Sequence, residues 1–368
     1  MKLRPWAARA LAGVAVVGLG LGLAACGSDS SSAGGSSDTS GGSAETTLNI
    51  GYVTTPQHPY GIALQAFADQ VKTDSGGKLA INLLPTYGGG NDLTLLDDVS
   101  GGTVDGGSIS SAVWDGKGVT SFEALQMPFL ITNYAVEAAV LNSPIAADML
   151  TGTDKVGIHG LAIHEGGLRK PLSANACLKT PADFKGVKIR SVESPVLVDG
   201  LKALGANPTP LPLSDVYLAL KQGTVDAMEA NLGLVFTQKF YEVSKCITGN
   251  VNLWPFPTVL GINQDKWDSL SAEQQGWLND AAAKIDDEAF AVLTDPTSTL
   301  VADLCTAGLK FGTASKADSA ALRTAVDPVY TKYTANEPTG GFVTAIEKIK
   351  AETPLPPAPK PYPDGCAE

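Results

Sequence analysis

The chain has 368 residues, of which 44% are hydrophobic and 17% are charged, and its formal net charge is -12. This length allows two domains of common size. The acidic balance, without any run of Lys and Arg, excludes a basic surface of the kind that binds nucleic acid.

Residues 1–25 have the pattern of a secretory signal peptide. Lys2, Arg4 and Arg9 precede an apolar run that is shorter than the roughly 20 residues that a membrane-spanning helix needs. The letters LAACG then place small residues directly before Cys26. This pattern resembles the lipobox of bacterial lipoproteins, which implies cleavage before Cys26 and attachment of a lipid to it. A plain signal peptide with an incidental cysteine is the alternative.

Residues 26–46 are rich in Ser and Gly and contain no large apolar side chain. Such a segment behaves as a flexible coil. We therefore expect a tether that holds an extracytoplasmic, lipid-anchored protein at the outer face of the cell membrane.

Four further cysteines, Cys177, Cys246, Cys305 and Cys366, form no C-x-x-C pair and have no His at metal-ligand spacing. Because the signal peptide indicates an oxidising compartment, we expect disulfides, with no metal and no cofactor. Three pairings are possible. We favour Cys177 with Cys246 and Cys305 with Cys366, because the second pair would hold the Pro-rich tail (353–368); free buried thiols are the alternative.

From Thr47 the sequence predicts strand, helix, strand, helix, strand. The segments are LNIGYVTT, a helix over 61–74 that ends at Gly76, then KLAINLLP, NDLTLLDDVSGG with Asn91 as its N-cap, and TVDGGSIS.

The same order returns from Val187. The segments are VKIR, the helix SPVLVDGLKALG with Ser194 as N-cap and Pro195 first, the strand NPTPLP, the helix SDVYLALKQG capped by Ser214, and TVDAM. The tetrapeptide GTVD occurs at the same point of each unit, at 102–105 and 223–226. We interpret it as a corner at which Gly ends a helix and Thr-Val begins a strand.

Two such units predict two lobes, each with a parallel sheet. Beyond them, Ser271 and Gln274 form a capping box that starts a long helix ending near Pro296. A strand at GLKFGT and helices over 316–334 and 342–352 follow.

Ligands bind beyond the carboxyl ends of the strands in open parallel sheets. This rule nominates four loops, at 54–60, 108–114, 191–194 and 228–231, which would face one another across a cleft.

The run TPADFKGVKIRSVESPVLVDGLKALGANPTPLPLSDVYLALKQGTVDAMEAN resembles the signature region of the solute-binding proteins of TRAP (tripartite ATP-independent periplasmic) transporters, DctP type. FADQVKTDSGGKLAINLLP, LQMPFLITN, HEGGLR and INQDKWDSLSAEQQGWLNDAA match as well. The resemblance implies an α/β, two-lobed periplasmic-binding-protein fold, type II-like. Each lobe would be a mostly parallel sheet flanked by helices, and a hinge and a long helix would link them. We expect lobe I at 47–166 plus about 256–295, and lobe II at 167–255 plus about 296–352.

This resemblance implies a monomer that captures a small organic acid between its lobes and delivers it to the membrane subunits of a TRAP permease. No enzyme is expected, since G-x-S-x-G, H-E-x-x-H and strand-linked G-x-G-x-x-G motifs are absent from the sequence. A lipid-anchored sensor for a histidine kinase and a binding protein for an ABC importer are the alternatives.

In the family, the arginine of the KIR strand, here Arg190, grips the ligand carboxylate, and Arg169 in GGLR matches a second arginine. The family usually continues its second corner with Glu-Asn-Pro, whereas this chain has Glu229-Ala230-Asn231. Asn231 therefore comes one position later than the asparagine that reaches the ligand in the family.

Loop residues complete the expected site. For the segment after the first lobe's third strand, the alternative is a solvated loop with Trp114 in the core. His58 is more typical of a structural residue than of a residue that contacts a ligand. The remaining candidates for ligand contact are Ser110, Ser111, Trp114, Ser194, Leu213, Glu229, Tyr52 and His58.

Overall fold

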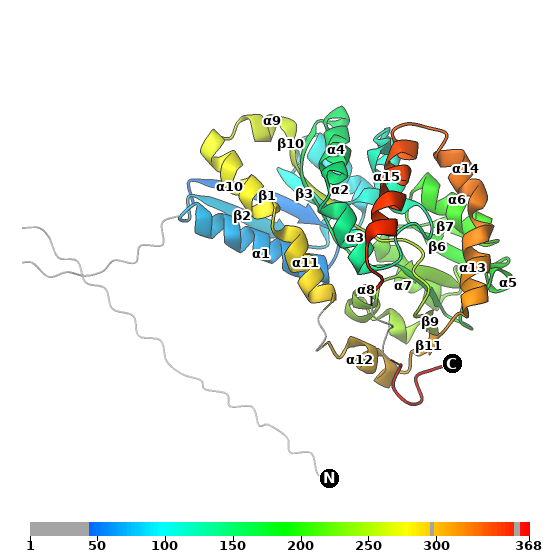
Figure 1. The fold of residues 1–368 in the computed structure, drawn as a ribbon. Helices are drawn as coiled ribbons and strands as arrows, with labels where there is room; N and C mark the ends of the chain where they lie inside the picture. The colour runs from blue at the N-terminus through cyan, green and yellow to red at the C-terminus, as the bar shows by residue number, and fades with distance from the viewer. Residues whose placement is uncertain (1–43, 295–297, 357–360) are drawn as a thin grey trace, which may run out of the picture. The chain divides into compact units, whose positions relative to one another are not determined.

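The computed structural model describes residues 44–294, 298–356 and 361–368 (Figure 1). The signal peptide, Cys26 and most of the tether lie outside these residues. Within the described ranges, no helix is both long and apolar enough to cross a bilayer.

The first sheet has five strands in the order β2-β1-β3-β10-β4. Strands β1, β2 and β3 are parallel, and β10 runs antiparallel to β3 and β4. One core cluster lies under α1, α10 and α11, and another includes side chains of α2, α3 and α4. The bounds are β1 (Thr46–Tyr52), α1 (Pro59–Asp74), β2 (Leu79–Leu84), α2 (Asp92–Ser100), β3 (Gly106–Ser110), α3 (Tyr134–Leu141), α4 (Pro144–Leu150), β4 (Ile158–His164), β10 (Thr258–Asn263), α9 (Gln264–Asp268), α10 (Ala272–Ala282) and α11 (Ile285–Leu293).

The second sheet has six strands in the order β11-β9-β5-β8-β6-β7. Strands β6, β7 and β8 are parallel, β5 is antiparallel to β8 and β9, and β11 is parallel to β9. The bounds are β5 (Lys170–Ser173), α5 (Pro181–Phe184), β6 (Lys188–Ser191), α6 (Pro195–Ala203), β7 (Asn207–Pro210), α7 (Leu213–Lys221), β8 (Ala227–Ala230), α8 (Leu232–Thr237), β9 (Cys246–Thr248), α12 (Leu300–Thr306), β11 (Lys310–Gly312), α13 (Lys316–Ala325), α14 (Asp327–Tyr333) and α15 (Thr339–Glu352).

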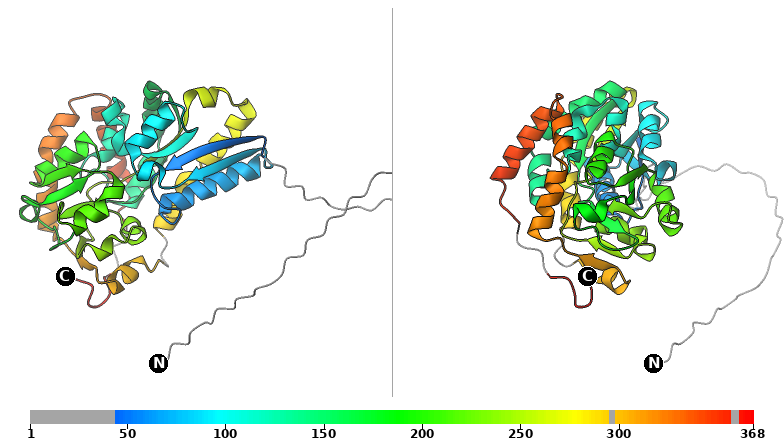
Figure 2. Two further views of the ribbon diagram at one scale, coloured as in Figure 1. Left: turned by 180° about the vertical axis from the view of Figure 1, so that it is seen from behind. Right: turned by 90° about the vertical axis from the view of Figure 1, so that its right-hand side faces the viewer.

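The predicted fold class, two sheets flanked by helices, is confirmed (Figure 2). Both sheets are mixed. The chain passes between them three times, from β4 to β5, from β9 to β10 and from β10 to β11, and the strands β5 and β10 run antiparallel to their neighbours.

The segment between β4 and β5 pairs with the segment between β9 and β10 at the hinge. The Arg169 amide donates to the Trp254 carbonyl at 2.8 Å, and the Leu253 amide donates to the Arg169 carbonyl at 2.8 Å. Away from the hinge, α14 packs on α6, and α15 packs on α3 and on the 3-10 segment η4 (Thr120–Gln126). The C-terminal helices therefore contact elements beside both sheets (Figure 1). The two hydrogen bonds at the hinge fix the backbone of Arg169 between the lobes.

The two GTVD corners have the same backbone structure. Gly102 has φ +74° and Gly223 has φ +71°, a region that glycine adopts readily. The next amides, of Thr103 and Thr224, bond back to carbonyls of the preceding helices at 2.8 and 2.9 Å. The prediction that Thr-Val begins each strand is wrong: β3 begins at Gly106 and β8 at Ala227, because Thr and Val complete the helix end instead.

The aspartate of each GTVD ties its corner to a neighbouring strand. Asp105 Oδ2 accepts from the Asn49 amide in β1 at 2.8 Å, and Asp226 Oδ2 accepts from the Lys188 amide in β6 at 3.2 Å. The repeat therefore builds the same helix-to-strand corner in both lobes.

Several helix boundaries differ from the predicted ones. The Ser271–Gln274 capping box is confirmed, but the long helix is interrupted between α10 and α11. Ser214 does not cap α7, which begins at Leu213, and its hydroxyl bonds Asp215 instead. The helix expected over 316–334 is divided into α13 and α14 because Pro328 lacks an amide hydrogen and fits only a first helical turn.

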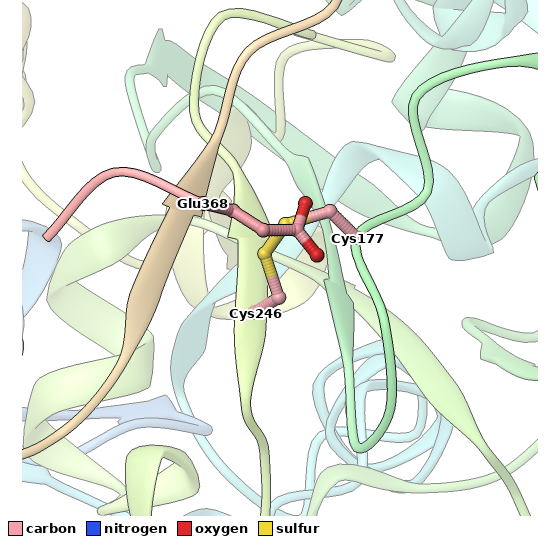
Figure 3. A group of neighbouring side chains, drawn as sticks. All are labelled: Cys177, Cys246 and Glu368. Atoms are coloured by element: carbon pink, nitrogen blue, oxygen red, sulfur yellow. A yellow bond between two sulfur atoms is a disulfide. The ribbon is translucent and has the colours of Figure 1, made fainter.

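Two disulfides, Cys177–Cys246 and Cys305–Cys366, are the pairs that the sequence analysis favours. The second holds the end of the tail against β11, where the Phe311 amide donates to the Cys366 carbonyl at 2.9 Å. Figure 3 shows the Glu368 carboxylate beside the sulfurs of Cys177 and Cys246. Because these sulfurs are bonded to each other, they offer no thiolate to a metal ion.

Gly223→Ala should lower the free energy of unfolding by about 1 kcal/mol, measured by denaturant titration, because a Cβ there meets no atom within 4 Å and only the positive φ is strained. Gly276→Ala is the matched control. Gly276 also has open space around it but lies inside α10, so alanine should stabilise the protein by roughly 0.5–1 kcal/mol. Equal effects at both positions would contradict this account of the corner.

Candidate functional site

Arg190 lies at the carboxyl end of β6, and its side chain is almost wholly buried, with 4% exposed. Its Nε and Nη2 donate to the Leu211 carbonyl at 3.0 and 2.8 Å, and its Nη1 donates to Glu229 Oε1 at 3.2 Å. A guanidinium carries five N–H groups. Described residues accept from three of them, which leaves one N–H on each terminal nitrogen without an acceptor among the described residues.

Arg169 lies at the hinge and is also 4% exposed. Its guanidinium carbon lies 3.7 Å from the centroid of the Phe256 ring, a cation–π contact. Its Nε is 3.4 Å from Glu229 Oε2, and its Nη1 donates to the Glu229 carbonyl at 3.5 Å. The aromatic face and Glu229 therefore hold this charge inside the protein.

Glu229, on β8, is fully buried and contacts both arginines, one with each carboxylate oxygen. Burying charges costs several kcal/mol per ion unless they are paired. Burial lowers the pKa of Arg190, and Glu229 opposes that effect. These three groups together carry one net positive charge, and the carboxylates of Asp92 and Glu193 also favour the charged form of Arg190.

Asp92 was not among the residues selected from the sequence. It occupies the first turn of α2, where an aspartate is ordinarily read as a favourable helix-start residue. Its Oδ1 accepts from the Ser110 amide at 2.9 Å, and burial raises its pKa to about 6 while Arg190 and Arg169 lower it. Only the tertiary structure brings this carboxylate near the two arginines.

Asn231 connects the two lobes rather than facing a ligand alone. Its Oδ1 caps α8 by accepting from the Leu234 amide at 2.7 Å, and its Nδ2 donates to the Gly166 carbonyl at 2.6 Å. The same Nδ2 lies 3.4 Å from His58 Nε2. His58 occupies the N-cap position of α1, and its burial, together with Arg169, lowers its pKa to about 3, so it is neutral at pH 7.

Two further contacts join the lobes. The Leu213 amide donates to the Gly90 carbonyl at 3.3 Å. Ser194 occupies the N-cap position of α6, as predicted, but its hydroxyl donates to Asp115 Oδ2 at 3.2 Å instead of capping the helix. Loops that follow β2 and β3 thus contact loops that follow β6 and β7.

The loop after β3 is divided between polar contacts and the core. Ser110 caps the next turn by accepting from the Ala112 amide at 3.2 Å, and Ser111 Oγ accepts from Gln126 Nε2 at 2.6 Å. Trp114 is fully buried and packs edge-on against Phe122, with ring centroids 5.5 Å apart. Its environment is that of a core residue. Tyr52, at the end of β1, is 1% exposed and belongs to the core under α1.

A group of buried acids lies beside the hinge. Glu137 of α3 and Glu165 are fully buried, and Asp286 of α11 is 9% exposed. Asp286 Oδ1 accepts from the Glu165 amide at 2.9 Å, and Glu165 Oε1 accepts from the Gly167 amide. Burial, then Glu165, raises the pKa of Glu137 well above its ordinary value, and burial raises that of Asp286 to about 7. Burial together with neighbouring carboxylates thus favours the protonated form of Glu137.

The comparisons with known proteins agree on one family. The model for bacterial extracellular solute-binding protein, family 7 (DctP), matches residues 50–337. The 2,3-diketo-L-gulonate-binding periplasmic protein YiaO of Escherichia coli is 33% identical over 229 residues, covering 62% of this chain and 69% of that protein.

Solved structures give the same result. A TRAP periplasmic solute-binding protein from Polaromonas sp. JS666, bound to D-erythronate, is 27% identical with a TM-score of 0.77, covering 83% of this chain and 99% of that one. Another, from Ochrobactrum anthropi with its C-terminus bound in its ligand-binding pocket, is 29% identical with a TM-score of 0.74, covering 84% and 97%.

Glu137→Gln tests the protonation of the acid group beside the hinge. A folded-state pKa above the unfolded value means that the unfolded state binds fewer protons, so the contribution of Glu137 to stability falls as the pH rises above the ordinary pKa of a glutamate. Relative to wild type, the variant should gain roughly 1–2 kcal/mol of unfolding free energy between pH 5 and pH 8. Exposed Glu288 of α11 offers the control Glu288→Gln, which should show no such trend. A pH-independent difference for Glu137→Gln would contradict the raised pKa of Glu137.

Proposed function

Because this chain belongs to bacterial extracellular solute-binding protein family 7, the DctP family, we propose that it captures a small organic acid between its lobes and delivers it to a TRAP-type permease. The observation that carries this proposal is a pair of N–H groups, one on each terminal nitrogen of buried Arg190, to which no described residue offers an acceptor. They form a planar fork that matches the two oxygens of a carboxylate.

The surrounding groups support capture of an anion. Arg169 adds a second buried guanidinium, and Glu229 balances only one of the two charges. An anion that enters this site loses its hydration, and attraction to the buried guanidiniums offsets that cost. The site therefore favours a ligand with at least one ionised carboxyl group.

Closure follows from the contacts between the lobes. The contacts of Asn231 with His58, Leu213 with Gly90 and Ser194 with Asp115 exist only when the lobes are together. A ligand that binds better to this closed form shifts the population toward it by its difference in affinity for the two forms. The permease would then receive the closed, loaded protein.

Binding rather than catalysis is the proposed activity. Ser108 Oγ lies 2.9 Å from His164 Nε2, but the same nitrogen is also 2.9 Å from Thr258 Oγ1, and all three residues are buried in the first sheet. Burial lowers the pKa of His164 to about 3, so it would be a weak general base. These three residues form a polar contact across β3, β10 and β4.

The location follows partly from the family, whose members are extracellular solute-binding proteins. We propose further that Cys26 carries a lipid, that residues 26–46 form the tether, and that the folded part acts as a monomer. The support for the lipid is the LAACG pattern that precedes the Ser/Gly-rich segment.

Arg190→Ala should weaken binding of an organic acid by roughly 3–5 kcal/mol, two to three orders of magnitude or more in Kd, because the ligand carboxylate loses its fork and Glu229 loses a partner. The measurement is isothermal titration calorimetry, with the acid chosen by a thermal-shift screen of organic acids.

Two variants accompany that titration. Arg190→Lys keeps the charge without the fork, and an intermediate loss would show that the fold survives while the geometry fails. Arg323→Ala, which removes a half-exposed arginine paired with Asp327, should bind like wild type. Wild-type affinity in Arg190→Ala would overturn the assignment of the site.

Cys26→Ala should release the full-length protein from the membrane fraction of cells, whereas Ser31→Ala in the tether should leave it there. Fractionation and mass spectrometry of the mature N-terminus provide the measurement. A Cys26→Ala protein that stays in the membrane fraction would contradict lipid anchoring at this residue.

A further inference from the structure

We propose that His58 makes ligand capture sensitive to pH, because the closed protein accepts this imidazole only in its neutral form, whereas the open protein lets it bind a proton. The inference rests on the proposed function, since it needs lobes that close on an organic acid. It adds to that function a loss of affinity in acid.

His58 lies where the start of α8 in lobe II meets the start of α1 in lobe I. Its own amide donates to the Thr55 carbonyl at 3.1 Å, and the residue is 1% exposed. On the side of α8, Asn231 Nδ2 lies 3.4 Å from His58 Nε2, and a Cβ on Gly233 would lie 3.0 Å from Cδ of Pro59. Part of the cover over the ring therefore comes from lobe II, and opening the lobes would admit water to it.

Both nitrogens of the His58 ring face N–H donors. The Tyr60 amide donates to Nδ1 at 3.4 Å. The Asn231 amide group is fixed in its orientation, because its oxygen accepts from the Leu234 amide and its nitrogen donates to the Gly166 carbonyl. The atom beside Nε2 is thus a nitrogen that can only donate. A neutral ring keeps one nitrogen as an acceptor, whereas an imidazolium would direct a hydrogen at each donor.

The titratable groups around the imidazole do not favour a positive charge on it. The ring of Tyr60 lies 4.4 Å away between centroids, and burial raises its pKa, so it stays neutral. His164 of β4 is neutral because burial lowers its pKa to about 3, and Arg169 is a cation. Asp92 acts on Tyr60, and Arg169 acts on Glu165, but neither acid is among the groups that shift the pKa of the imidazole.

The direction of the pH effect follows from these surroundings. Burial, then the charge of Arg169, lowers the pKa of His58 to about 3 in the closed form, whereas a solvated imidazole has a pKa of about 6.5. Between these two values the open protein binds a proton that the closed protein lacks. Closure must release this proton, so the affinity for a ligand that requires closure falls as the pH falls below about 6.5, by up to about tenfold per pH unit.

Buried carboxyl groups would act in the opposite direction. Burial raises the pKa of Asp92 and the pKa of Asp115 to about 6. Closure that buries such groups takes up protons, which strengthens binding as the pH falls. A loss of affinity in acid therefore indicates His58, and a variant without the imidazole isolates its share of the pH dependence.

The experiment titrates D-erythronate, the acid bound in the Polaromonas structure, by calorimetry at about pH 8 and about pH 5.5, where its carboxyl group stays ionised. His58→Asn keeps an acceptor for the Tyr60 amide at the start of α1 but cannot take up a proton. Between these two pH values, wild type should lose roughly tenfold more affinity than His58→Asn. His159→Asn is the control and should follow wild type, because His159 stacks on Trp267 inside lobe I, with ring centroids 4.0 Å apart.

A titration of the imidazoles by nuclear magnetic resonance tests the same inference without any variant. In the ligand-free protein, His58 should titrate near pH 6.5, and saturation with D-erythronate should keep it neutral down to about pH 5. The titration of His159 should be the same with and without the acid. A His58 ring that stays neutral at about pH 5 in the ligand-free protein would overturn the inference, as would equal pH dependence of binding in wild type and His58→Asn.

The outcomes also separate this inference from the proposed function. If Arg190→Ala abolishes binding but His58 contributes nothing to the pH dependence, the function stands and the role of His58 is wrong. If D-erythronate does not bind, the tightest acid from the thermal-shift screen takes its place in the same titrations. If no organic acid binds even at about pH 8, the proposed function fails and this inference fails with it.

Discussion

The structure depends on one buried carboxylate, Glu229, held between two buried guanidiniums. Each charge alone would cost several kcal/mol to bury, and the three together carry one net positive charge. The backbone satisfies this requirement by placing β8 beside β6, which brings Glu229 to Arg190, and by pairing the hinge segments, which brings Arg169 to the same carboxylate. The charge that remains is the reason to expect an anionic ligand at this place.

Much of the fold follows from local sequence signals. The repeat of GTVD indicated two equivalent units because glycine is required where φ is positive, and both copies do form the same corner. Arg190 could be predicted as a ligand-binding residue because both its position at a strand end and the family motif around it indicate that role. The strand starts after GTVD were predicted too early, since Thr and Val are favourable in strands yet here bond back to the preceding helix. Strand propensity alone does not tell whether Thr and Val begin a strand or complete the end of the preceding helix.

The rest of the site depends on contacts between distant segments, which the sequence does not display. Ser194 has the pattern of a helix cap, but Asp115 of the other lobe takes its hydroxyl. Asp92 resembles an ordinary helix-start residue until the fold places two arginines near it. The expected long helix is interrupted where α11 turns Asp286 toward the Glu165 amide, a tertiary bond that no period of apolar residues reveals. In each case a partner more than 70 residues away decides the role of the residue.

The most direct measurement of the central claim is a crystal structure of the protein with an organic acid bound. The account predicts that the two free N–H groups on the terminal nitrogens of Arg190 donate to the two oxygens of one ligand carboxylate, at about 2.7–2.9 Å, while Glu229 stays between the arginines. A ligand carboxylate bound elsewhere, with Arg190 still donating only to Leu211 and Glu229, would contradict it.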